Sequence, residues 1–372
     1  MKKRLVSINQ MSKYFKRKYL IIRKKKINEK KESNIGSISR TFLSSLIIIS
    51  CFSIAPLFIN FTKNQIIFSK DYANNSKNKL KTLLEDKDQI LDSDLDNVFL
   101  FEDIIAFDER TIDSVRLSAA TIEELFKSTN YSLEDVRKTK LVKPITLTLL
   151  PNEIKKIENT KKRKDLFIQI ILPLIIKENN NIRFDRKKLF SVLNKSKNTK
   201  IEKIWLNSKF KQYGVENKDL STLKIRMDEV PVSMAIAQAA KETGWGTSRF
   251  AQEGNALFGQ WTWSGEGIKP SDADTDSTHK VMKFKILQAS VRAYQRNLNT
   301  HSSYKDFRSA RAELREKGKK LDSIMLSEYL DKYAEIGKEY VIVLQQIIKQ
   351  NNLTDFDDAK LMPSSINLES LI

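Results

Sequence analysis

The sequence predicts a mostly helical α+β chain with a small β-lobe, preceded by a membrane anchor and a helical N-terminal region. Three observations lead to this fold class. Apolar residues recur at helical spacing through most of the second half of the chain. The good candidate for a strand in that half is a short alternating segment after a stretch rich in Gly, Ser and Asp. A run of 21 uncharged residues near the N-terminus predicts the anchor.

The anchor is predicted at Thr41 to Phe61, directly after a strongly basic segment. Met1 to Arg40 holds 14 Lys and Arg against two Glu, a net charge of +12 out of the +20 of all 372 residues. At about 1.5 Å per residue, the uncharged run spans a hydrocarbon core of roughly 30 Å. The positive-inside rule then places residues 1–40 in the cytoplasm. We therefore expect a single-pass protein of the inner (cytoplasmic) membrane, with the rest of the chain periplasmic or extracellular.

Other interpretations of this N-terminal region stay open. Ser53 and Ala55 are small residues that suit a signal peptidase, although Pro56 would follow the cut. Ile48 to Cys51 resembles a lipobox, but the chain stays apolar after Cys51, which fits a membrane helix better. Because the basic segment directly precedes an apolar span, it indicates an orientation signal, and no nucleic-acid partner is expected.

The cysteine and histidine content excludes several chemistries. Cys51 is the only cysteine, so the exported part has no disulfide and no thiol nucleophile. His279 and His301 are the only histidines, too few for most histidine metal sites. We expect no metal and no cofactor, and carboxylates must carry most of any catalysis.

Composition and periodicity divide the rest of the chain. Thr62 to about Ser93 is polar and typical of a stalk, and the segment up to Thr139 has helical patterns, with Ser132 as a helix cap. The predicted divisions are 1–40 basic segment, 41–61 anchor, 62–139 stalk and helical region, 140–215 helical region packing on the principal domain, 216–353 principal domain and 354–372 tail.

Four segments define the expected elements around the principal domain. Pro144 to Pro151 is β-branched and predicts a short strand or an extended connector. Leu166 to Ile176 is apolar but too short to cross a bilayer, so a buried helix kinked at Pro173 is expected. Leu321 to Gly337 predicts a helix capped by its glycine, and a last helix places Tyr340, Val343, Leu344, Ile347 and Ile348 on one face.

The stretch "AIAQAAKETGWGTSRF", Ala235 to Phe250, places one carboxylate at the end of a helix of small residues. Pro231 suits the first turn of this helix, and Gly244 suits its end. Small residues let neighbouring elements approach closely, so Glu242 is expected to be partly buried. Burial away from a cation raises a carboxyl pKa, which retains the proton that a general acid needs. An acid that only caps or pairs locally is the alternative.

Aromatic residues follow this helix in "NALFGQWTW", Asn255 to Trp263. Their faces can stack on sugar rings, and amide side chains can bond hydroxyl or acetamido groups. A hydrophobic turn of the core is the alternative for any one aromatic. The expected substrate-binding residues here are Asn255, Phe258, Gln260, Trp261 and Trp263.

The predicted β-lobe comes next and ends in "HKVMKF", whose alternation predicts a strand. "DADTD", Asp272 to Asp276, superficially resembles a calcium-binding loop but lacks the following glycine and the distal glutamate of an EF-hand. It is therefore not assigned to a metal.

Taken together, these segments resemble the Bax family of bacterial glucosaminidases, in glycoside hydrolase family 73. The resemblance is carried by "VPVSMAIAQAAKETGWGTSRFAQEGNALFGQW", followed in order by "THKVMKF", "SVRAYQRNLNTHSSYKDFR" and "YAEIGKEYV". It covers about Lys143 to Leu353. It implies a lysozyme-like helical domain that cuts the β-1,4 bond after N-acetylglucosamine in peptidoglycan.

The resemblance also implies roles for individual residues. Glu242 matches the general acid of the family, and Trp245 is expected among the substrate-binding residues. Tyr333, taken as catalytic, and Tyr340, taken as substrate-binding, match the C-terminal tyrosine motif that shapes the cleft. The expected partners are peptidoglycan glycan strands and, through residues 41–61, the inner membrane.

The second catalytic group is left open by the sequence. Glycosidases commonly pair an acid with a base or nucleophile. The family is thought to take this group from the β-lobe, where Lys280 stands at a position that can hold glutamate in relatives. The candidates are Glu266, Asp272, Asp274 and Asp276, and assistance by the substrate acetamido group is the alternative. A lytic transglycosylase and a non-catalytic glycan-binding or scaffold protein remain the rival functions.

Overall fold

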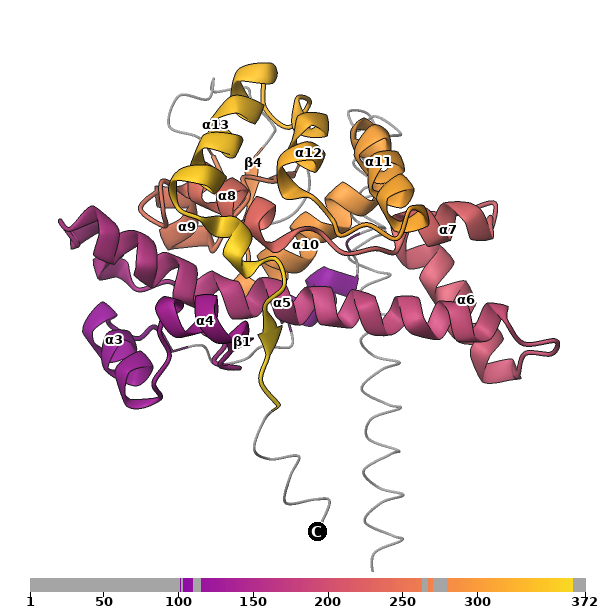
Figure 1. The fold of residues 1–372 in the computed structure, drawn as a ribbon, viewed down its shortest axis with the longest axis horizontal. Coiled ribbons are helices and arrows are strands. Elements are labelled where there is room, and N and C mark those ends of the chain that lie inside the picture. The colour runs from indigo at the N-terminus through magenta and orange to yellow at the C-terminus, as the bar shows by residue number, and fades with distance from the viewer. Residues whose placement is uncertain (1–100, 102, 110–114, 263–266, 270–279, 364–372) are drawn as a thin grey trace, which may run out of the picture. The chain divides into compact units, whose positions relative to one another are not determined.

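A long helix, α5 (Thr160–Leu193), runs across the structure and organises the elements around it, as Figure 1 shows. Helices α3 (Ala119–Ser128) and α4 (Leu133–Thr139) lie on one side of it, and most of the later helices lie on the other. The structure is a computed structural model that describes residues 101, 103–109, 115–262, 267–269 and 280–363. All of them belong to one unit, Gln89–Ile372.

The remaining elements are mostly short helices joined by tight turns. In chain order they are β1 (Leu141–Val142), η1 (Asn152–Lys156), α6 (Lys200–Gln212), α7 (Leu220–Arg226), α8 (Val232–Thr243), α9 (Arg249–Gly254), β2 (Trp261–Thr262), β3 (Gly267–Ile268), β4 (Lys280–Met282), α10 (Leu287–Thr300), η2 (Ser302–Tyr304), α11 (Lys305–Glu316), α12 (Ser323–Ser327), η3 (Glu328–Leu330), α13 (Lys338–Gln350), η4 (Leu353–Phe356) and β5 (Lys360–Leu361).

Two small sheets complete the described fold. β1 pairs in parallel with β5, so the segment before α5 is joined to the C-terminal end of the described chain. β4 lies between β2 and β3 and pairs antiparallel with both. The mostly helical fold class with small sheets is confirmed, and the predicted strand in "HKVMKF" is confirmed as β4.

Helix α8 is almost entirely enclosed by the elements around it. Every residue from Val232 to Ala240 is buried, including the polar Ser233 and Gln238. The helix packs against α5, α12, α13 and η4. Its alanines have no side chain beyond Cβ, so neighbouring helices can approach the α8 backbone closely. The main core surrounds α8 as a result.

The N-terminus of α8 is capped by a residue far away in the chain. Its own N-cap, Pro231, offers no side-chain hydrogen bond. The Asp357 carboxylate instead accepts hydrogen bonds from the Ser233 backbone N–H and from its hydroxyl, both at 2.8 Å. At the start of α10, the Asp108 carboxylate accepts the backbone N–H groups of Lys285 and Ile286, the two residues that precede the helix. Free N–H groups at a helix start need such acceptors.

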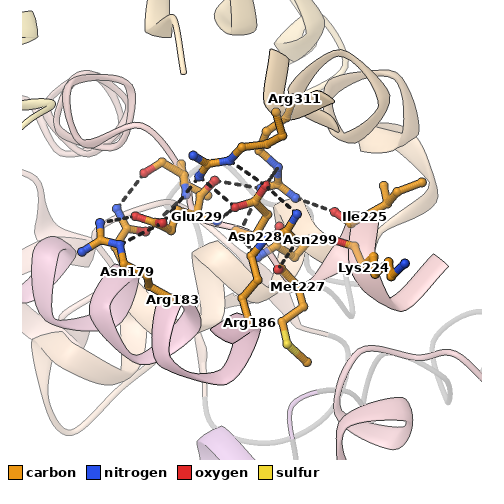
Figure 2. Close-up of polar contacts among 12 residues, drawn as sticks. Asn179, Arg183, Arg186, Lys224, Ile225, Met227, Asp228, Glu229, Asn299 and Arg311 are labelled. Atoms are coloured by element: carbon orange, nitrogen blue, oxygen red, sulfur yellow. Dashed lines mark hydrogen bonds and ion pairs between the residues drawn. The ribbon is translucent and has the colours of Figure 1, made fainter. Parts of the chain in front are cut away.

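A buried charge network holds the segment that leads into α8 (Figure 2). Asp228 is 2% exposed, and its carboxylate lies 3.0 Å from Arg315 and 3.9 Å from Arg311. Arg311 is fully buried and also donates to the backbone carbonyls of Ile225, Asp228 and Glu229. Arg186 of α5 lies 3.8 Å from the same carboxylate. The network therefore ties α5, α7 and α11 to the start of α8.

The Asp228 carboxyl stays ionised within this network. Burial alone would raise its pKa, but the positive charges of Arg311, Arg315 and Arg186 outweigh burial and hold the pKa below its usual value. The ion pairs are therefore present throughout the neutral pH range.

Several local expectations are confirmed. Ser132 caps α4 by accepting the Asp135 backbone N–H. Leu166 to Ile176 is buried inside α5 except for the half-buried Gln169, and the helix continues through Pro173, while the expected kink there stays a prediction. Gly244 ends α8 in the left-handed conformation, and Pro231 is the N-cap immediately before its first turn.

One expectation differs from the structure. Leu321 to Gly337 is not one helix: α12 and η3 are followed by turns, and Gly337, with φ +55°, precedes α13. The segment 144–151 is an extended connector, which is one of the two alternatives expected for it. Beyond residue 353, Phe356 is buried and β5 pairs with β1.

The predicted anchor, 41–61, and the stalk that follows it lie outside the described residues. Within the described part of the chain, none of the helices combines the length and the apolar composition that a bilayer crossing requires.

The remote cap of α8 gives a stability prediction. Asp357→Ala removes both acceptors of Ser233, and losing a cap costs about 1–2 kcal/mol. We expect the free energy of unfolding to fall by that amount in urea denaturation. Asp358→Ala is the matched control, because Asp358 makes only an exposed ion pair with Lys320. Equal effects of the two substitutions would contradict the capping role.

The buried network gives a second stability prediction. Asp228→Asn leaves Arg311 buried without its counter-charge, which costs about 3–5 kcal/mol. Because the carboxyl pKa is lowered in the folded state, this contribution is complete at neutral pH and is lost only as the pH falls below about 4. Denaturation of wild type and variant at pH 7 and pH 3 checks it. A difference that grows at pH 3 would contradict the assignment.

Candidate active site

Glu242 is the penultimate residue of α8 and is partly buried. Burial raises the pKa of its carboxyl group, while the hydrogen bond from Tyr340 and the charge of Lys241 act in the opposite direction. Among the described residues it forms no ion pair. A carboxyl group in this environment holds a proton to a higher pH than a solvated glutamate does.

Three side chains connect Glu242 to the core through hydrogen bonds with fixed directions. The Tyr340 hydroxyl donates to Glu242 Oε1 at 2.8 Å. The same hydroxyl accepts from Gln238 Nε2 at 3.1 Å, and Gln238 Oε1 accepts from the Tyr294 hydroxyl at 2.6 Å. Because the Gln238 amide is engaged at both ends, its orientation is determined. The Tyr340 proton is consequently directed to Glu242.

The second carboxylate oxygen, Oε2, lies against Gly259. A Cβ atom at that position would be 3.1 Å from Oε2, and the backbone there has φ +61°. Both the space and the conformation favour glycine. Gly259 therefore leaves room beside the oxygen that Tyr340 does not contact.

The turn after Glu242 has an uncommon backbone. Gly244, Trp245 and Gly246 all have positive φ, of +56°, +61° and +83°. A Cβ at Gly246 would be 2.9 Å from the Phe167 ring. Gly246 thus allows the turn to pack directly on Phe167 of α5.

A stack of tyrosines lies beside Glu242. The rings of Tyr333 and Tyr340 are stacked, with centroids 5.5 Å apart, and Tyr304 lies 6.0 Å from Tyr333. The Tyr333 hydroxyl donates to the Phe258 carbonyl at 2.8 Å. Burial, with the Glu242 charge, raises the pKa of both Tyr333 and Tyr340, so both phenols are neutral at physiological pH. Tyr333 thereby positions the residue directly before Gly259.

The structure separates the predicted substrate-binding residues into two groups. Phe258 is buried and stacked on Tyr294 at 3.9 Å, so its ring faces the core and not a ligand. Asn255 is also buried, and its amide donates to the carbonyls of Phe284 and Lys285. Trp245 packs edge-on against Phe167. These three residues support the fold around Glu242.

The second group remains accessible to a ligand. Trp261 in β2 is 46% exposed. Gln260 is half-buried, and its Oε1 is itself buried, with no hydrogen-bond partner in the part of the chain that the structure describes. The two residues follow Gly259 directly. Trp261 is the exposed one among the predicted binding residues that the structure describes.

Trp263 and the four predicted β-lobe carboxylates, Glu266, Asp272, Asp274 and Asp276, lie outside the described residues. The described residues contain no group of three or more His, Cys, Asp or Glu arranged to hold a metal ion.

Sequence reasoning missed the roles of Gln238 and Tyr294. Gln238 stands four residues before Glu242, so both lie on one helix face, and this spacing was the available signal. Tyr294 comes from α10, and nothing in the sequence places it beside α8. Gly259 lies inside the aromatic segment "NALFGQWTW", and its contact with the Glu242 carboxylate depends on the fold.

A separate pocket of about 490 Å³ lies elsewhere in the described structure. It is lined by α3 and the first half of α5, including Glu123, Lys127, Lys162 and Gln169. None of the residues that contact Glu242 lines it. It is therefore not part of this site.

Comparison with known proteins defines the class of the chain. A family model described as mannosyl-glycoprotein endo-beta-N-acetylglucosaminidase matches residues 221–353, a range that includes Glu242, Tyr333 and Tyr340. The chain thus carries a glucosaminidase domain. It is 32% identical over 197 residues to the Escherichia coli K12 protein described as "Protein bax", covering 50% of this chain and 69% of that relative. The chain belongs to the Bax family. No solved structure matches it.

The hydrogen bond from Tyr340 predicts a measurable pKa change. In Tyr340→Phe the carboxylate loses a donor that stabilises its charged form, so the Glu242 carboxyl pKa should rise further. Carbon-13 NMR titration of labelled glutamate side chains checks this. Tyr333→Phe is the control, because its hydroxyl bonds the Phe258 carbonyl and not the carboxylate. An unchanged or lowered Glu242 pKa in Tyr340→Phe would disprove the assignment.

Proposed function

We propose that this protein is a peptidoglycan hydrolase, an endo-β-N-acetylglucosaminidase that cleaves the β-1,4 bond after N-acetylglucosamine in cell-wall glycan, with Glu242 as general acid. The family supports a glycosidase that acts on N-acetylglucosamine linkages. The observation that carries the assignment to Glu242 is its partly buried carboxyl group, hydrogen-bonded by Tyr340 at 2.8 Å inside the matched domain. A general acid needs a held proton and a fixed orientation, and this arrangement favours both.

The hydrogen-bond directions assign the proton to one oxygen. Oε1 accepts the Tyr340 hydroxyl, so the transferable proton resides on Oε2, beside Gly259. In the proposed reaction, Oε2 donates this proton to the glycosidic oxygen as the bond to the sugar breaks. Gln238 acts through Tyr340 as a positioning residue, because its amide fixes the direction of the phenol proton.

The second catalytic group in this proposal comes either from the β-lobe or from the substrate. Glu266, Asp272, Asp274 and Asp276 are the protein candidates for a base or nucleophile. The acetamido group of the substrate is the alternative. The separation of two carboxylates would decide between inversion and retention.

The proposed location follows from the sequence. An uncleaved anchor at 41–61, with residues 1–40 in the cytoplasm, would place the hydrolase on the outer side of the cytoplasmic membrane, where peptidoglycan lies. The basic balance of residues 41–372, about +8, suits an anionic polymer.

The central prediction concerns Glu242→Gln. The amide can still accept from Tyr340 but cannot donate an acidic proton, so turnover of purified peptidoglycan should fall by a factor on the order of 100 or more. Because burial raises the Glu242 pKa, ionisation opposes folding at neutral pH, and the variant should be at least as stable as wild type there. Substantial residual activity would reject Glu242 as the acid.

Mass spectrometry of the released fragments identifies the reaction in the same experiment. Reducing N-acetylglucosamine ends that disappear in Glu242→Gln support the glucosaminidase. Anhydromuramoyl ends would instead indicate a lytic transglycosylase. Binding to the wall without release of fragments would indicate a glycan-binding or scaffold protein. Glu253→Gln is the matched control, because Glu253 is an exposed glutamate on the next helix, α9.

A further inference from the structure

The positive charge of the chain beyond residue 40 is concentrated around α6. Residues 183–226 contain 13 Lys and Arg and four Asp and Glu, a net of +9. The whole of residues 41–372 has a net of about +8, so the rest of that range is close to neutral. The segment includes the end of α5, all of α6 and α7, and most of it precedes the family match at 221–353.

The apolar packing of helix α6 on the rest of the described fold is on one side. Phe210 is buried, and Trp205 and Leu206 are partly buried against it in a small cluster with Leu189 of α5. The cluster is separate from the main core. In Figure 1, α6 and α7 lie at the end of the structure reached by the C-terminal half of α5.

The opposite side of α6 combines lysines with uncovered isoleucines. At 100° per residue, seven exposed residues share this side, and we call them the α6 outer face. They are Lys200, Ile201, Lys203, Ile204, Asn207, Ser208 and Lys211. Ile201 is 77% exposed and Ile204 is 59% exposed. The two isoleucines are neighbours on the helix surface, three residues apart.

None of the α6 residues on this face is acidic. Glu202, the acid of α6, points to the other side, where it forms a capping box with Thr199 and an ion pair with Lys195. The face therefore offers positive charge around an apolar centre. An anionic polymer would satisfy the lysines but leave the isoleucines in water, whereas an apolar protein surface would cover the isoleucines but not match three lysines. The boundary of an anionic bilayer accommodates both, since acyl chains receive the isoleucines and headgroups pair with the lysines.

We propose that the α6 outer face docks on the surface of an anionic phospholipid bilayer. The isoleucines enter the boundary between headgroups and acyl chains, and the lysines bind the headgroup phosphates. Docking would hold the unit that carries Glu242 against the membrane in a defined orientation. The proposal rests on α6 alone and does not depend on the proposed reaction.

The test uses the full chain reconstituted in vesicles, with Cys51→Ser and a single new cysteine, Ile204→Cys, that carries an environment-sensitive nitrobenzoxadiazole dye. Vesicles of phosphatidylcholine alone are compared with vesicles that contain phosphatidylglycerol. The chain is attached in the same way to both kinds of vesicle, so a difference in dye emission between them comes from contact of the α6 outer face with the lipid. On the anionic vesicles we expect the dye emission to rise about twofold and to shift to shorter wavelength. In high salt the emission should fall back to its level on the phosphatidylcholine vesicles. Dye at Gln346→Cys, exposed on α13, should not respond.

A charge-reversal pair completes the design. The triple variant Lys200→Glu, Lys203→Glu and Lys211→Glu should abolish the fluorescence change. The triple variant Lys332→Glu, Lys338→Glu and Lys349→Glu changes the net charge equally at exposed sites elsewhere and should preserve it. Equal emission on neutral and anionic vesicles would overturn the proposal. So would loss of sedimentation with purified peptidoglycan in the first triple variant without any lipid effect, since the face would then bind the wall.

Discussion

The enclosure of α8 is the constraint on which the rest of the structure depends. A helix buried at nine consecutive positions must be surrounded by other elements, and its alanines set how closely they approach. Four elements, α5, α12, α13 and η4, meet around it. The polar residues of α8 are then forced to find partners inside the protein, and Gln238 finds them in two tyrosines. The packing around α8 therefore also determines the hydrogen-bond chain that reaches Glu242.

Local sequence signals predicted the elements that depend on local chemistry. The cap at Ser132, the end of α8 at Gly244 and the apolar part of α5 required only side-chain type and spacing. The break after Ser327 was not predicted, because the segment to Gly337 keeps an apolar pattern that does not show where tertiary packing ends a helix. Composition alone also could not show that Phe258 faces Tyr294.

In the candidate site, too, local sequence signals predicted some features and tertiary contacts determined the others. The glutamate was identified from its helix, its small neighbours and its glycines, all within one stretch. Its partners were not, because Tyr340 is 98 residues away along the chain and Tyr294 reaches it only through Gln238. The surface of α6 extends this point, since its chemistry follows from helical spacing but its exposure required the fold.

The remote cap on α8 sets an order of assembly during synthesis. The acceptor of the Ser233 N–H group, the Asp357 carboxylate, lies 124 residues later in the chain. At roughly 5–20 residues per second, the ribosome needs about 6–25 s to supply it. Until then the first turn of α8 has no side-chain cap, and β5 is not present to pair with β1. The helix that carries Glu242 is completed only when the nascent chain has been translated almost to the last residue described.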